Sequence, residues 1–109
     1  MKQYAGRRQG HAAIVTVDGR PLNPRLDLWN HSPTGFEWGY GGSGPAQLAL
    51  AILADHSGND QQAFNFYHRF KWMVIAKLPI GSWTLTSREI DQALQTLQES
   101  EPALDSVAS

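Results

Sequence analysis

The chain has 109 residues, and nine Lys and Arg against ten Asp and Glu give a formal net charge of −1. This balance excludes a strongly basic nucleic-acid coat protein. The chain contains no Cys, so a disulfide framework and a thiolate metal site are excluded, and a reducing compartment is expected. No apolar run reaches the length of a membrane span, and no secretory signal is visible at the N-terminus. We therefore expect a cytoplasmic protein without a membrane partner.

The N-terminal part of the chain carries the signals of strands. Residues 11–17 are rich in β-branched side chains and end at an Asp-Gly pair, the strongest short signal for a hairpin. We expect residues 20–23 to form the returning arm and residues 4–8 to add a first strand. Alternation of Leu with a charged residue at 26–28 predicts a further short strand.

The middle of the chain predicts a strand that leads into a central helix. Residues 36–40 alternate large aromatic side chains with other residues, which predicts a strand with one aromatic face. Pro45 suits the first turn of a helix, so we predict a helix over residues 46–56 that Gly58 ends. Apolar side chains surround this helix on nearly every face, so other elements must cover it on several sides.

Two further helices are predicted before the C-terminus. Asn59 or Asp60 can cap the first of them, which we expect to end near residue 77, ahead of a proline. A capping box over residues 86–89 predicts the start of the second. Residues 100–109 read as a frayed tail.

These elements predict one domain over residues 1–109 with an α+β fold. Its core would be a small, mostly antiparallel sheet from the N-terminal half packed with three helices.

A glycine-rich loop before the central helix is the most unusual feature. Four glycines within six residues let backbone N–H groups approach a ligand at the positive end of the helix dipole, where a phosphate or carboxylate would bind. The candidate ligand residues are Ser32, Glu37, Tyr40, Gly41, Gly42, Ser43 and Gly44. The loop lacks a Walker lysine and dinucleotide-binding spacing. The alternative interpretation is that the glycines only allow a tight turn beside bulky aromatic residues.

Catalytic and metal sites have weaker support. We interpret Glu37 as a solvated carboxylate, although it could act as a base with His31 as its nearest partner. A triad of Ser43, His31 and Asp27 lacks a nucleophile-elbow sequence. The four His residues show no metal-ligand spacing, and His31 is interpreted as fixing a turn by hydrogen bonds. We predict no catalytic residue, metal or cofactor.

Residues 67–72 interleave basic and aromatic side chains, a pattern that can serve single-stranded nucleic acid. The net charge of the chain argues against that partner. Arg69 and Trp72 lie off the apolar stripe of the helix, together with Lys71, and the first two are candidate contacts to a protein partner. The alternative is that Trp72 packs inside the molecule, against Trp83 or the last helix.

The chain resembles a small family of domains of unknown function from bacteria, archaea, phages and mobile elements, whose signature reads GFEWGYGGSGPAQLALAIL here. The matching residues are 4–7, 31–32, 35–46, 48–53, 70–71, 78–79 and 83–85. The resemblance implies a single domain and residence on mobile DNA, and it brings no established activity. Small proteins in that setting often act by binding, including the blocking of host defence complexes.

We therefore expect a small non-enzymatic binding protein that acts on another protein. The alternative is recognition of a small anionic ligand, a nucleotide or phosphate, at the glycine-rich loop. Hydrolysis through His31 and Glu37 is the weakest of the three hypotheses.

Overall fold

The computed structural model describes the backbone of residues 2–108 and the side chains of residues 2–99. Four strands form one antiparallel sheet in the order β3-β2-β1-β4. The strands are β1 (Gln3–Gln9), β2 (Ala12–Val17), β3 (Arg20–Pro21) and β4 (Trp83–Thr86). The predicted hairpin is confirmed, with Asp18 and Gly19 in the left-handed region at its turn. Tyr4 in β1 pairs with Val17 on one side and Leu85 on the other.

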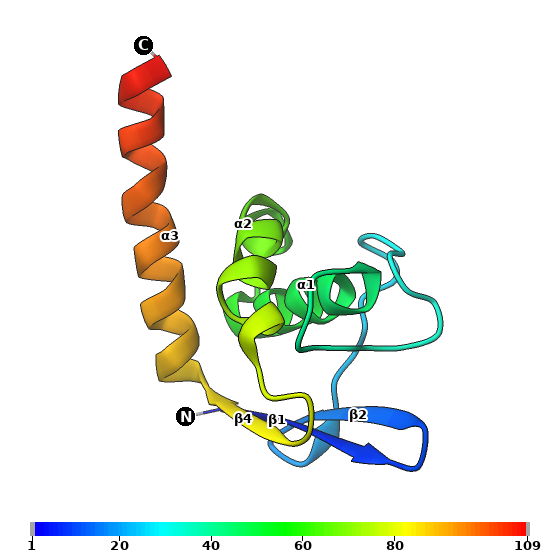
Figure 1. Ribbon diagram of the computed structural model, residues 1–109. Coiled ribbons are helices and arrows are strands. Elements are labelled where there is room, and N and C mark those ends of the chain that lie inside the picture. Colours follow the sequence, from blue (N-terminus) through cyan, green and yellow to red (C-terminus); the bar gives the residue numbers. More distant parts are fainter. Residues whose placement is uncertain (1, 109) are drawn as a thin grey trace.

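Three α-helices and one short 3₁₀ helix complete the fold. They are α1 (Ser43–Ser57), α2 (Asp60–Met73), η1 (Ile75–Lys77) and α3 (Ser87–Ala108). Figure 1 shows α1 and α2 stacked above the sheet, with α3 rising beside α2 and its C-terminal half projecting past them. The predicted α+β class is confirmed, and β4 adds a C-terminal strand to a sheet otherwise built from the N-terminal part of the chain.

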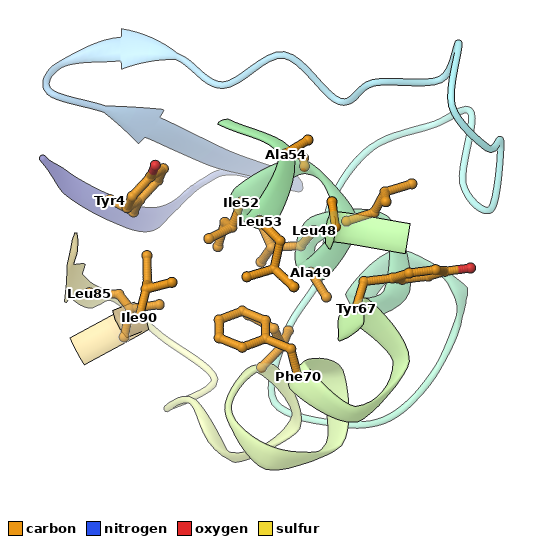
Figure 2. Close-up of a cluster of buried hydrophobic side chains, with 14 of the residues drawn as sticks. Tyr4, Leu48, Ala49, Ile52, Leu53, Ala54, Tyr67, Phe70, Leu85 and Ile90 are labelled. Carbon is orange, nitrogen blue, oxygen red and sulfur yellow. The ribbon is translucent and has the colours of Figure 1, made fainter. Parts of the chain in front are cut away.

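The core is built around α1. All of its residues from Gly44 to Ala54 are buried, as expected for a helix without a polar face. Figure 2 shows Tyr4 of the sheet, Phe70 of α2 and Ile90 of α3 converging on its apolar side chains. The sheet, α2 and α3 therefore each contribute side chains to the core around α1.

Local capping signals fix the helix ends. Gly58 ends α1 in the left-handed conformation, and the side chain of Asn59 accepts a hydrogen bond from the backbone of Gln62 at 3.1 Å. The predicted capping box is also confirmed: the backbone N–H of Thr86 donates to the Glu89 carboxylate at 2.9 Å, and that of Glu89 donates to the Thr86 hydroxyl at 3.2 Å. The helix α1 begins two residues before Pro45.

Two predicted strands are wrong. Residues 36–40 form no strand because Gly39 has a φ of 87°, which turns the chain so that Trp38 is fully buried and Tyr40 is exposed. Residues 26–28 form a turn instead, in which Arg25 has a φ of 55° and its carbonyl accepts a hydrogen bond from the N–H of Leu28.

Two helix ends also differ from expectation. The helix α2 stops at Met73, and the chain continues as the separate helix η1, so the expected end near residue 77 is four residues late. The backbone of α3 is helical through residues 100–108, where the sequence favoured a frayed tail.

Candidate functional site

A cleft of about 430 Å³ opens beside the N-terminal end of α1. Five of the seven predicted ligand residues line it, and they are Ser32, Glu37, Tyr40, Ser43 and Gly44. His11, the start of β2 and residues 34–36 supply the rest of its wall. The tertiary structure therefore brings most of the predicted ligand residues to one concave surface, while Gly41 and Gly42 are not among its lining residues.

Two of the polar side chains that line the cleft, Ser32 and Glu37, are paired within the protein. The guanidinium of Arg8 lies 3.0 Å from Oε1 of Glu37, and the hydroxyl of Ser32 donates to the carbonyl of Gly35 at 2.6 Å. Within the described residues, the hydroxyl of Ser43 has no hydrogen-bond partner, and no side chain caps α1. Free donors at this helix end favour a small anion, whereas the Glu37 carboxylate opposes one except where Arg8 neutralises it.

Gly44 has a packing role in the same place. A Cβ atom built there would lie 2.7 Å from the Cβ of Glu37 and 3.2 Å from its backbone nitrogen. Only glycine lets the segment around Glu37 run this close to the first turn of α1. This contact supports the interpretation that glycines in this loop serve close packing.

The catalytic arrangements considered from the sequence do not form. The ring of His31 makes a 2.7 Å hydrogen bond with the hydroxyl of Tyr67 and lies away from Glu37, which pairs with Arg8. Asp27 is held by Arg25, so it does not orient His31. The backbone N–H of His31 also donates to the side chain of Gln47 at 2.7 Å.

A second surface lies around residues 39–42. Tyr40, Trp72 and Ile80 are 50%, 59% and 60% exposed, and we call these three residues the Trp72 patch. The backbone of this segment separates them: the Trp72 ring lies against Gly41, and the Ile80 side chain lies against Gly39. The predicted partner residue Trp72 is therefore on the surface, outside the core.

The two other residues predicted on this face of α2, Arg69 and Lys71, are less exposed than Trp72. The guanidinium of Arg69 lies 5.0 Å from the centroid of the Phe66 ring, and the side chain is half-buried. Lys71, which the sequence placed on the outer face, is 9% exposed, and its ammonium lies 4.5 Å from the centroid of the Trp72 ring. Its long apolar stem can be buried while the charged end rests on an aromatic face.

A second concavity, of about 280 Å³, lies where the loop before residue 32 meets α2. Its lining residues are Trp29, His31, Phe64, Tyr67 and His68. Sequence analysis missed this site because the two lining segments are more than thirty residues apart, and no local pattern predicts that they meet.

A model of a family of unknown function, DUF6166, matches residues 4–96. The chain belongs to this family. The DUF6166 match includes both concavities and the Trp72 patch, and it ends within α3. No curated protein and no solved structure matches the chain.

Two further findings concern this DUF6166 chain over the residues that the structure describes. None of their helices is both long and apolar enough to cross a membrane. They also contain no group of three or more His, Asp or Glu side chains that could hold a metal ion.

Proposed function

We propose that this DUF6166 protein is a non-enzymatic binding protein of the cytoplasm that contacts another protein through the Trp72 patch. One observation carries the proposal: Tyr40, Trp72 and Ile80 each expose half or more of their surface around one short backbone segment. Large aromatic side chains are enriched among the residues that dominate binding energy at protein interfaces. Clusters of exposed apolar side chains commonly mark interaction sites.

Close backbone packing supports a binding role for these side chains. The Trp72 ring rests on Gly41, the Ile80 side chain on Gly39, and the Tyr40 ring lies beside Gly42. Side chains held in this way lose little conformational freedom when a partner covers them, so more of the interaction energy remains as affinity. The glycines of the signature would then serve the presentation of the patch.

The charges beside the patch favour a partner with an apolar centre and acidic surroundings. Lys71 places its ammonium at the Trp72 ring, and Arg69 lies one turn earlier on α2. The resemblance to proteins of phages and mobile elements extends the proposal to a specific role, inhibition of a host defence complex. That role depends on the partner being such a complex.

The test compares two exposed tryptophans. Trp72→Ala is the variant, and Trp29→Ala is the matched control because Trp29 is 54% exposed but lies outside the patch. Each protein is used as bait in host lysate, and a captured partner is purified and titrated by calorimetry. We expect Trp72→Ala to weaken binding of that partner at least about tenfold, since hot-spot truncations commonly cost 2 kcal/mol or more.

Ile80→Ser serves as a second variant in case Trp72→Ala alters the fold, and melting temperatures are recorded for all proteins. A purified partner that binds the wild type and both patch variants equally would contradict the proposal. Failure to isolate any partner that binds the purified wild type would also contradict it.

A second candidate function has one observation in its favour, the cleft at the N-terminal end of α1 that contains five predicted ligand residues. There the protein would bind a small anion such as a nucleotide or inorganic phosphate. Ser43→Asp places a carboxylate at the helix end, which should stabilise α1 and displace the anion. Calorimetry with phosphate and a nucleotide panel should show that the wild type binds at least one of these ligands and that Ser43→Asp does not. If the wild type binds none of them, this candidate function is excluded for those ligands.

A further inference from the structure

Five rings line the second concavity, which we call the ring pocket. Trp29 and Phe64 meet edge to face with their centroids 6.2 Å apart, and both side chains are partly exposed. Tyr67 lies below them: its ring packs on Phe64 at 5.9 Å and on His68 at 4.1 Å. In Figure 2 the Tyr67 hydroxyl points away from the other labelled core side chains. The pocket is thus walled by flat side chains.

A buried amide holds one wall of the ring pocket in place. Gln47 of α1 is fully buried, and its oxygen accepts hydrogen bonds from the backbone N–H groups of His31 and Ser32 at 2.7 and 3.1 Å. Its nitrogen donates to the carbonyls of Pro24 and Trp29 at 2.6 and 3.1 Å. Four bonds from one side chain fix the loop that carries Trp29 and His31 against α1, and the 2.7 Å hydrogen bond between His31 and Tyr67 joins the same loop to α2. The pocket is therefore formed before any ligand arrives.

The polar groups at the base of the ring pocket are neutral at pH 7. Burial of the ring, and then the positive charges of His68 and Lys71, hold the pKa of His31 below its ordinary value. Burial also raises the pKa of Tyr67. The hydrogen-bonded His31–Tyr67 pair therefore offers a donor and an acceptor without charge.

The five side chains that line the ring pocket include no carboxylate. The carboxylates nearest the lining residues in the sequence, Asp27 and Asp60, both pair with Arg25 at 3.0 to 3.1 Å.

We propose that the ring pocket binds a small planar aromatic molecule, of the chemical class that includes nucleobases and indoles. The aromatic ring of the ligand would stack on one of the two exposed rings, Trp29 or Phe64, and meet the other edge to face, because these two rings are nearly perpendicular. The His31–Tyr67 pair would hydrogen-bond the polar edge of the ligand. The pocket volume of about 280 Å³ suits one such ring with its substituents rather than a longer polymer.

The test is a titration followed by NMR of the ring protons of His31 and His68. The probes are AMP, UMP and indole-3-acetate as planar anions, adenosine as a neutral ring, and ribose 5-phosphate as an anion without an aromatic ring. We expect at least one planar probe, charged or neutral, to shift both His signals, and ribose 5-phosphate to leave the signals unchanged. Absence of shifts with every planar probe would overturn the proposal, as would equal shifts with ribose 5-phosphate.

Variants distinguish binding in the ring pocket from binding at the Trp72 patch or in the cleft beside α1. Trp29→Ala and Phe64→Ala should each weaken binding about tenfold, in line with the contribution of one stacking contact. Both side chains are partly exposed, so the fold should survive, and an unchanged far-ultraviolet spectrum verifies it. Trp72→Ala and Ser43→Asp should leave the affinity unchanged. Loss of binding in Ser43→Asp with no effect of Trp29→Ala would place the ligand in the cleft at α1 and overturn the proposal.

Discussion

Gly39 and Gly10 have similar backbone conformations but differ in how closely other atoms surround them. Their φ angles are 87° and 61°, both in the region that other residues rarely adopt. A Cβ atom on Gly39 would meet the Ile80 side chain and lie 3.3 Å from the carbonyl oxygen of Leu78, whereas Gly10 faces open space.

We predict that Gly39→Ala lowers the free energy of unfolding by about 1 to 3 kcal/mol more than Gly10→Ala, because both variants carry the backbone strain but only the first also overpacks its surroundings. Urea denaturation of both variants measures the difference. Equal midpoints would mean that the contact around Gly39 relaxes without cost.

His31 makes stability depend on pH. Burial and the charges of His68 and Lys71 lower its pKa in the folded state from the ordinary value of 6.5. Between 6.5 and the lowered value the unfolded chain binds a proton that the folded chain does not, so the free energy of unfolding falls as the pH drops below 6.5.

The variant His31→Gln should remove this part of the pH dependence, and denaturation at a series of pH values from 7 downward, about half a unit apart, measures it. If wild type and variant lose stability in parallel over this range, His31 is not the source.

At the scale of elements, α1 determines whether the molecule folds. Leu50 and Leu53 are fully or almost fully buried within it. We predict that Leu50→Ala and Leu53→Ala each lower the free energy of unfolding by about 2 to 5 kcal/mol, through lost burial and the cavity left behind. Asn65→Ala, on the exposed face of α2, is the control and should stay within about 0.5 kcal/mol of the wild type. Losses in the leucine variants no larger than in this control would contradict a central role for α1.

The predicted and observed elements agree where short-range interactions decide them. The capping box of α3 joins Thr86 to Glu89, and Gly58 alone can end α1 in a left-handed conformation. The alternation of aromatic residues over 36–40 predicted a strand, but the chain turns at Gly39 and no strand forms there. Trp38 is buried against residues far along the chain, where its indole N–H donates to the carbonyl of Ile80 at 2.9 Å, forty-two residues away in the sequence.

For the whole molecule, the contribution of the C-terminal half of α3 can be measured by truncation. Leu97 is the last buried side chain among those described, and Figure 1 shows the helix projecting past α1 and α2. We predict that a chain ending at Glu99 keeps the free energy of unfolding within about 0.5 kcal/mol of the full chain. Thermal denaturation of both chains is the measurement. A melting temperature many degrees lower would show that residues 100–109 pack on the domain.

The amino-acid sequence by itself determined the hairpin, the helix starts, the burial of α1 on all sides and the α+β class. It also identified the loop whose residues line the cleft beside α1. These features depend on contacts between residues close in the chain or on the periodicity of apolar side chains, and both can be recognised in the amino-acid sequence alone.

Only the tertiary structure decided which surfaces the molecule presents. Trp29 meets Phe64 of α2 because Gln47 of α1 holds the loop that carries Trp29 in place, and the exposed ring of Trp72 lies against Gly41. Lys71 is buried although its position on the helix suggested an outer face. Each of these outcomes depends on packing between segments far apart in the sequence. The shape of the neighbouring backbone, and not the residue type, determines which side chains are buried there.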